Sequence, residues 1–317
     1  MKVLVTGAAG FLGQRVIQSL LSGPPGLSPL SRIVAVDLVA CRSEDSRVEA
    51  QAGTITDPAF IASIAGSGID VVYHLAAVLS GQSESDFELG MQVNVDATRA
   101  LLDACRRLPT APRFVFASSV AVFGGRLPAV VPEDMALLPQ SSYGTEKAIG
   151  ELLVADYSRR GFVDGIVCRL PTVTVRPGRP NSAASSFVSG IIREPLAGIE
   201  SVCPVPLETR LWISSPAIVT ANLVHAARVT AAALDGRRAV NFPGLCVTAR
   251  EMLASLERVG GREARALVRC EPDERIVRIV GTWPGAFDVS RPLRLGFVVD
   301  RDMDAIVQQY MREVQET

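Results

Sequence analysis

The sequence has few histidines and no paired cysteine motif, and both absences limit its chemistry. Two histidines are too few for a typical metal cluster, so we expect no metal site. The six cysteines include no C-x-x-C pair, and Cys105 and Cys168 stand in apolar runs. This usage is typical of reduced core residues in a cytoplasmic protein, not of a disulfide framework or a zinc site.

A strong charge of one sign and a long apolar run are also absent. The net charge is −1 and the basic residues are scattered, which argues against nucleic acid or a membrane surface as the main partner. No apolar run approaches the length of a membrane-spanning helix, and the N-terminus has the pattern of a strand, not of a signal peptide. A chain of 317 residues with 48% hydrophobic residues is long enough for one large domain or a domain plus a lobe.

The first thirteen residues predict a strand, a glycine turn and a helix. Val3 to Val5 form a short apolar run, Gly7, Gly10 and Gly13 follow at a spacing of three, and a helical apolar pattern starts at Phe11. Such glycines allow a tight turn, close approach of a pyrophosphate, and packing of the helix on the strand. The helix N-terminus then faces the phosphates. The spacing is G-x-x-G-x-x-G, and a tight turn without a ligand is the alternative, but the flanking strand and helix favour dinucleotide binding.

Two aspartates are candidates for the adenosine end of such a cofactor. Residues 32–37 predict a second strand that ends at Asp37, where a carboxylate accepts hydrogen bonds from both ribose hydroxyls and repels a 2′-phosphate. We therefore predict NAD as the cofactor. An exposed strand-end aspartate is the alternative, and the nearby Arg42 keeps NADP open. Asp57 follows a predicted strand at 52–55 and either caps the next helix or faces the adenine.

Strands and helices alternate to about residue 170, which predicts an α/β fold with a Rossmann-type, doubly wound parallel sheet. Prolines then interrupt the pattern. We divide the chain into an NAD-binding domain at 1–172 and a smaller lobe at 173–317 that mainly binds substrate, with some segments returning to the first domain. Further strands are expected at 70–77, 113–117 and 165–170, and helices at 87–108, from 142, at 215–234, from 248 and at 302–314.

Two polar residues, Asn94 and His74, are unexpected inside the predicted elements in which they lie. Asparagine is a poor residue for a helix interior, so Asn94 either faces solvent or holds water or backbone near the site. His74 lies inside a predicted buried strand, and we expect it to be a hydrogen-bonded core residue.

Tyr143 and Lys147 are four residues apart on one predicted helix, so their side chains share a face. An ammonium group beside a phenol favours the phenolate, and we expect it to lower the tyrosine pKa. Tyrosine then accepts the proton of an alcohol whose hydride passes to a nicotinamide. Ser119 stands at the carboxyl end of the fifth predicted strand, where it can hold the substrate oxygen. A surface Tyr–Lys pair is the alternative reading.

These motifs resemble the extended branch of the short-chain dehydrogenase/reductase superfamily over nearly the whole chain. The resemblance implies that Ser119, Tyr143 and Lys147 are catalytic, with Ser119 preferred over Ser118 by its spacing from Gly124. It also implies a set of residues that contact NAD: Gly7, Gly10, Phe11, Leu12, Gly13, Asp37, Asp57, Leu75, Ala76, Ala77, Asn94, Tyr143, Lys147, Leu170, Pro171 and Thr172. By analogy with such enzymes we expect a homodimer.

The stretch from Arg169 to Asn181, with residues 185–187, looks like the D-erythronate dehydrogenases, a group that oxidises the 2-hydroxyl of a four-carbon sugar acid with NAD. The resemblance implies oxidation of D-erythronate to 2-oxo-D-erythronate. A sugar-acid substrate needs a cation for its carboxylate, and Arg176, Arg179 and Arg210 are candidates. Surface or lobe–sheet pairing is the alternative for each arginine. The alternative functions are a nucleotide-sugar epimerase or reductase, and a regulator that senses NAD(P) without turnover.

Overall fold

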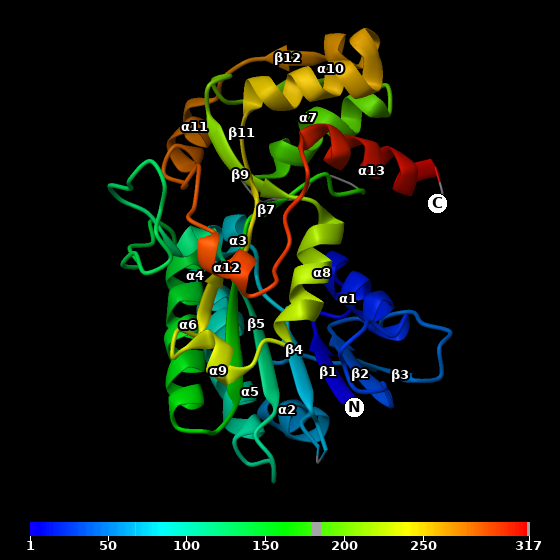
Figure 1. The fold of residues 1–317 in the computed structure, drawn as a ribbon, viewed down its shortest axis with the longest axis vertical. Coiled ribbons are helices and arrows are strands. Elements are labelled where there is room, and N and C mark those ends of the chain that lie inside the picture. Colours follow the sequence, from blue (N-terminus) through cyan, green and yellow to red (C-terminus); the bar gives the residue numbers. More distant parts are fainter. Residues whose placement is uncertain (67, 179–184, 316–317) are drawn as a thin grey trace.

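The computed structural model describes residues 1–66, 68–178 and 185–315. Its central sheet has seven strands in the order β10-β6-β5-β4-β1-β2-β3, and all neighbours are parallel (Figure 1). The strands are β1 (Lys2–Thr6), β2 (Arg32–Asp37), β3 (Val48–Ala52), β4 (Val71–His74), β5 (Arg113–Ser119), β6 (Asp164–Leu170) and β10 (Ala239–Asn241). The strand order reverses between β1 and β4, and ligands bind beyond the carboxyl ends of strands at such a point.

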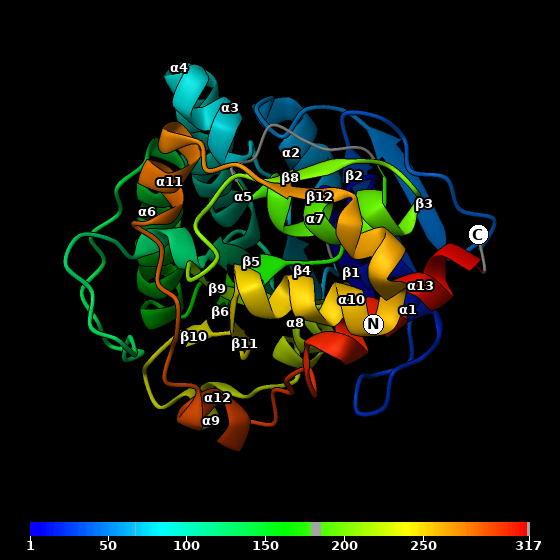
Figure 2. The ribbon, with the colours of Figure 1, turned by 90° about the horizontal axis from the view of Figure 1, so that it is seen from above.

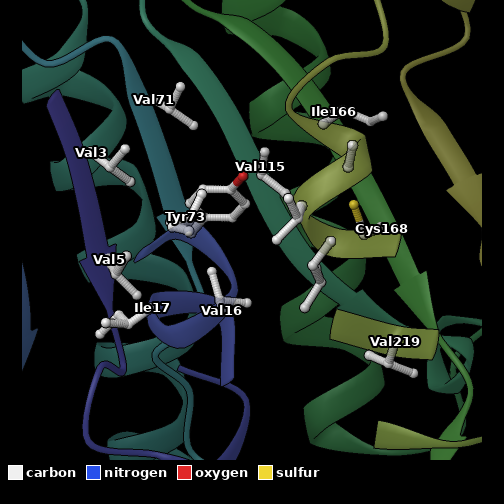
Figure 3. Close-up of a cluster of buried hydrophobic side chains, with 14 of the residues drawn as sticks. Val3, Val5, Val16, Ile17, Val71, Tyr73, Val115, Ile166, Cys168 and Val219 are labelled. Carbon is white, nitrogen blue, oxygen red and sulfur yellow. The ribbon is translucent and has the colours of Figure 1, made fainter. Parts of the chain in front are cut away.

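Helices cover both faces of this sheet (Figure 2). Because side chains alternate along a strand, Val3 and Val5 of β1 face one layer while Leu4 faces the other. The first layer contains α1 (Phe11–Leu21) and α8 (Pro216–Ala226), and its apolar contacts with the strands are seen in Figure 3. The second layer contains α2 (Pro58–Ile64), α5 (Ala97–Cys105) and α6 (Ser142–Arg159). The arrangement confirms the predicted α/β, doubly wound fold.

The second half of the chain builds a smaller lobe above the carboxyl edge of the sheet (Figure 1). Its own apolar core lies between helices and two small sheets, β11-β9-β7 and β12-β8. The strands are β7 (Thr172–Val173), β8 (Ser201–Cys203), β9 (Arg210–Ser214), β11 (Leu245–Thr248) and β12 (Val268–Cys270). The helices are α7 (Ser186–Leu196), α10 (Ala249–Ala266), α11 (Glu274–Val280), α12 (Ser290–Arg294) and α13 (Met303–Gln315). No helix in the described part of the chain is long and apolar enough to cross a membrane.

The third strand of the sheet lies earlier than predicted. We expected a strand at 52–55, but β3 ends at Ala52, and the N–H of Gly53 donates to Asp37 in the last contact with β2. Thr54 and Thr56 then form a turn through their hydroxyl groups, 2.7 Å apart. Glu49 and Gln51 alternate with Val48, Ala50 and Ala52 in β3, so the strand has no continuous apolar run that would have revealed it.

Two predicted helices are interrupted in the structure. The expected helix at 215–234 stops at Ala226, and a separate short helix α9 (Ala231–Leu234) begins after Thr230, whose hydroxyl accepts from the N–H of Ala233. The expected helix at 87–108 consists of α4 (Phe87–Gly90), a π-helical turn η1 (Met91–Asp96) and α5. The wider π turn contains Asn94, and such turns are frequent at functional sites. Short segments α3 (Ser80–Ser85) and η2 (Val120–Val122) complete the fold.

A buried ion pair joins α6 to the central strands. Arg169 on β6 donates three hydrogen bonds of 2.7–3.0 Å to the carboxylate of Glu151 on α6. Ser118 on β5 donates to the same carboxylate at 2.5 Å, and Arg169 also reaches the side-chain oxygen of Asn241 on β10 at 3.3 Å. The pair therefore connects strands from both halves of the chain to one helix.

We expect Glu151→Ala to lower the free energy of unfolding by about 3–5 kcal/mol, because it leaves the Arg169 charge buried without its partner. Urea unfolding of the variant measures the loss. The double variant Glu151→Leu/Arg169→Met removes both charges at similar volume and should recover most of that stability. Equal stability of the single variant and the parent protein would contradict a buried ion pair.

Candidate active site

The glycine turn packs directly against the end of β4. Gly7 has a φ of +72°, which favours glycine, and a Cβ on Gly7 would lie only 2.7 Å from the backbone nitrogen of Ala76. A Cβ on Gly13 would overlap the carbonyl oxygen of Gly7. Gly10 caps α1 without any side-chain hydrogen bond, so the first-turn N–H groups of α1 are available to an anion. The bare turn and open helix end fit a dinucleotide pyrophosphate.

Asp37 lies beside this turn at the end of β2. Its carboxylate accepts hydrogen bonds from the N–H of Ala9 at 3.0 Å and of Leu38 at 2.7 Å. These bonds fix the carboxylate and leave lone pairs for ribose hydroxyls. Leu38 is 74% exposed and Val39 is 64% exposed, so they offer an apolar surface next to Asp37. The sequence reasoning missed these two residues, although two apolar side chains directly after a strand-end carboxylate are a visible signal.

Asp57 is exposed and caps α2 by accepting from the N–H of Ala59 at 2.9 Å. The capping alternative is therefore present in the structure. A carboxylate has further acceptor sites, so contact with the adenine remains a prediction.

His74 is a buried hydrogen-bonded residue, as predicted, and is 1% exposed. The Thr98 hydroxyl donates its single proton to the carbonyl of Asn94 at 2.8 Å, so it accepts from His74 Nε2–H at 2.9 Å. His74 Nδ1 then accepts from the Thr6 hydroxyl at 2.7 Å, and Thr6 accepts from the N–H of Ala76 at 3.3 Å. This chain of bonds fixes the ends of β1 and β4 relative to η1.

Asn94 is buried, with 1% of its surface exposed. Its side chain accepts from the N–H of Val78 at 2.9 Å and donates to the carbonyl of Val78 at 3.0 Å. It also donates to Glu146 at 2.6 Å and to Ser83 at 3.3 Å. Of the alternatives left open by the sequence, the structure shows Asn94 holding backbone near the site. Asn94 therefore fixes the segment after β4, and its contact with NAD stays a prediction.

Ser119, Tyr143 and Lys147 come together at the carboxyl edge of the sheet. The Ser119 hydroxyl accepts from the N–H of Ala121 at 3.1 Å and lies near the phenol of Tyr143. The nitrogen of Lys147 lies 5.7 Å from the Tyr143 ring centroid and 5.0 Å from that of Phe116. Ser118 points to the other side of β5, toward Glu151, so the choice of Ser119 agrees with strand alternation.

Lys147 is buried, and among the described residues no group accepts a hydrogen bond from its ammonium. Burial lowers the pKa of Lys147 to about 8, while the charges of Glu146 and Glu151 oppose that shift. An ammonium group in this position can donate up to three hydrogen bonds to a ligand. The hydroxyls of a nicotinamide ribose have the required chemistry.

The pKa of Tyr143 is raised to about 12, first because of burial and further because of Glu146, while the Ser119 hydroxyl lowers it. We expected Lys147 to lower this pKa, but the net shift is upward and Lys147 is not among its causes. Burial penalises the phenolate more than its neighbours favour it.

The remaining predicted contacts surround this centre. Leu75, Ala76 and Ala77 follow β4 and are half-buried, and Leu170, Pro171 and Thr172 follow β6. The two groups lie at the same edge of the sheet, so they can flank a dinucleotide. Among the described residues, no group of three or more His, Cys, Asp or Glu side chains could hold a metal ion.

The candidate arginines differ in their surroundings. Arg176 is half-buried, and burial together with the charge of Arg193 lowers its pKa. No described residue accepts a hydrogen bond from the Arg176 guanidinium, whereas Arg193 is paired with Glu194. Arg210 is exposed at the start of β9. Arg179 lies outside the described residues.

The chain is similar to known proteins over most of its length. The sequence model of the NAD dependent epimerase/dehydratase family matches residues 3–233. A D-erythronate dehydrogenase of Cupriavidus necator is 51% identical over 99% of this chain and 98% of its own length. A D-erythronate dehydrogenase of Haemophilus influenzae is 44% identical over 98% of this chain and 99% of its own length. The solved structure of a nucleoside-diphosphate-sugar epimerase from Agrobacterium tumefaciens has a TM-score of 0.94 and 39% identity, covering 100% of this chain and 95% of that chain.

We expect the free energy of unfolding to decrease as the pH falls, because of His74. Burial lowers the pKa of His74 to about 3, whereas an unfolded histidine titrates near 6.5. The unfolded chain thus binds the proton first as the pH falls, so stability is complete above about pH 6.5 and is lost toward pH 3. The expected slope is about 1.4 kcal/mol per pH unit between pH 6 and 4.

Urea unfolding across this pH range measures that slope. His74→Gln should be less stable near neutral pH but should lack the His74 part of the acid dependence. Parallel stability curves for the parent protein and this variant would contradict a neutral, buried His74.

Proposed function

Because the chain belongs to the NAD dependent epimerase/dehydratase family, we propose that it is an NAD-dependent dehydrogenase that oxidises the 2-hydroxyl of D-erythronate, or of a close sugar acid, to the 2-oxo acid. The choice of substrate rests on the similarity to two D-erythronate dehydrogenases over nearly the full length of each chain. The grouping of Ser119, Tyr143 and Lys147 at the sheet edge supports the oxidation chemistry.

Each of these residues has a distinct part in the proposed reaction. Bound NAD supplies the acceptor for the hydride that leaves C2. Ser119 holds the 2-hydroxyl oxygen, and Tyr143 takes the hydroxyl proton as the carbonyl forms. Lys147 donates hydrogen bonds to the nicotinamide ribose and stabilises the phenolate by its charge. The rate should rise with pH as the Tyr143–Lys147 site loses a proton.

For the cofactor, we propose NAD over NADP. Asp37 is held in place by two backbone N–H groups beside the glycine turn, where its charge would repel a 2′-phosphate. Arg42 is exposed and remains the residue that would serve NADP. Comparable kcat/KM values for the two cofactors would contradict this choice.

For the substrate carboxylate, we propose Arg176, although the sequence alone favours Arg179, which follows Gly178 in the loop after the sixth predicted strand, ahead of Arg176 and Arg210. The half-buried guanidinium of Arg176 follows β7, which continues from the nicotinamide end of the proposed site. An anion would relieve both the burial of this charge and its repulsion by Arg193. The part of the lobe around Arg176 would therefore orient C2 by holding the acid group.

We also propose a cytoplasmic homodimer acting in carbohydrate metabolism. Phe87 on α4 and Leu152 on α6 are large apolar side chains exposed by 56% and 68%. The two helices pack against each other, and burying such side chains against a second copy would be favourable. Sedimentation of the purified protein measures its oligomeric state. The Leu152→Glu variant, measured in parallel, should dimerise less if Leu152 lies at the interface.

The decisive assay follows NAD reduction across a panel of aldonic acids, with UDP- and GDP-sugars in parallel. D-Erythronate should give net NADH. The 39% identity to a nucleoside-diphosphate-sugar epimerase makes epimerisation the second candidate, and an epimerase would convert the sugar without net NADH. Turnover of a nucleotide sugar alone would overturn the dehydrogenase proposal.

We expect Tyr143→Phe to lower kcat by about 10²–10⁴-fold, because only the proton acceptor is removed. NAD affinity should stay within a few-fold, since the ring and its packing remain. Lys147→Met should damage both turnover and NAD binding. A Tyr143→Phe enzyme that keeps more than about a tenth of the parent rate would exclude Tyr143 as the base.

We expect Arg176→Ala to raise KM for D-erythronate by about 10–100-fold, which corresponds to the loss of a charged hydrogen bond. The KM for NAD should change little. Arg210→Ala is the matched control because its guanidinium is exposed, and its KM should stay near that of the parent. The same rise in both variants, or in neither, would remove Arg176 from the substrate site.

A further inference from the structure

Glu146 is a buried carboxylate immediately before Lys147, and the proposed mechanism does not use it. It is 0% exposed. Its Oε2 accepts from the Asn94 amide at 2.6 Å and from the Ser83 hydroxyl at 3.0 Å. Its Oε1 has no hydrogen-bond partner and lies against Gly90, where even a Cβ would overlap it. A carboxylate buried this completely needs a compensating charge.

Both hydrogen bonds that the Glu146 side chain accepts reach one oxygen, Oε2. The other oxygen, Oε1, has no hydrogen-bond partner among the described residues. The bonds to Asn94 and Ser83 therefore fix the position of the Glu146 side chain on α6, between Tyr143 and Lys147 in the chain.

We propose that Glu146 is a positioning residue that sets the proton balance of the Tyr143–Lys147 pair. The inference rests on the proposed function of that pair. Glu146 faces Asn94 and Ser83 and does not reach the substrate side of α6, so it acts on the reaction only through its charge. Because of its negative charge, the Tyr143–Lys147 pair loses its proton at a higher pH than it would without Glu146.

The surrounding charges agree with this role. Glu146 raises the pKa values of both Tyr143 and Lys147, acting against burial on Lys147 and with burial on Tyr143. Glu151 acts on Lys147 in the same direction but is neutralised by Arg169. His74 on β4 is neutral and lies near Lys147. Other titratable groups on the elements packed against α6 are Glu84 on α3, Asp86 and Glu88 around α4, Asp96 on η1, Arg99, Asp103 and Cys105 on α5, Arg113 on β5, and Asp164 and Cys168 on β6.

The experiment compares Glu146→Gln with the parent enzyme. Glutamine keeps an acceptor for Asn94 and Ser83 but removes the charge. Because a nearby negative charge disfavours deprotonation of both partners, both titration steps of the coupled pair should move to lower pH, by about one unit or more. The pH profile of kcat/KM should shift as a whole toward acid.

A second readout needs no cofactor. The absorbance of the Tyr143 phenolate, obtained as the difference between each protein and its Tyr143→Phe counterpart, should also appear at lower pH in Glu146→Gln. Two controls separate charge from structure. Ser83→Ala removes one hydrogen bond and keeps the Glu146 charge, and Glu84→Gln removes an exposed charge that accepts from the N–H of Ser142 at 3.0 Å. Both controls should leave the pH profile in place.

Superimposable profiles and phenolate titrations for Glu146→Gln and the parent would overturn the proposal. If Glu146→Gln does not fold, the smaller neutral variant Glu146→Thr replaces it, and failure of both to fold would show a purely structural need. Full activity of Tyr143→Phe would refute the proposed function itself, whereas an inactive Tyr143→Phe with an unmoved Glu146→Gln profile would refute only the role of Glu146.

Discussion

The buried pair of Glu151 and Arg169 fixes the relative positions of the three candidate catalytic groups. Glu151 lies one helical turn beyond Lys147 on α6, Ser118 precedes Ser119 on β5, and Arg169 precedes Leu170 on β6. A buried ion pair adds little net stability, since desolvation offsets the attraction. The pair instead fixes the rotational position of α6 relative to β5 and β6, because a rotation of α6 would leave one of these charges without its partner. The geometry of the site therefore depends on contacts one residue or one turn away from the reacting groups.

Much of the fold follows from local patterns in the sequence. The apolar run at Val3, the proline at the start of α2 and of α8, and the capping box of Thr248 and Glu251 each specify an element that the structure contains. The failures also have local causes. β3 is an edge strand without a continuous apolar run, so its pairing with β2 comes from tertiary contact. The break between α8 and α9 depends on the Thr230 cap, and no glycine or proline between residues 217 and 234 marks it in the sequence.

The candidate site residues could be predicted where their spacing along one helix or one turn brings them together. Tyr143, Lys147 and the glycine turn could be assigned because helix and strand geometry place them without knowledge of distant neighbours. Glu146 could not, because its burial depends on Gly90 and Asn94, which meet it only in the folded chain. The net direction of the Tyr143 pKa shift could not be predicted for a similar reason. It depends on how completely the fold excludes water from the phenol, and the spacing of two residues in a sequence does not show this.

The central sheet takes its last strand, β10, and one of its covering helices, α8, from the part of the chain that follows residue 172. The chain therefore crosses from sheet to lobe and back more than once before it ends. In evolutionary terms, a single recombination event near residue 172 would separate β6 from its neighbour and strip α8 from the core. Exchange of one continuous C-terminal segment would therefore replace part of the core of the sheet together with the lobe.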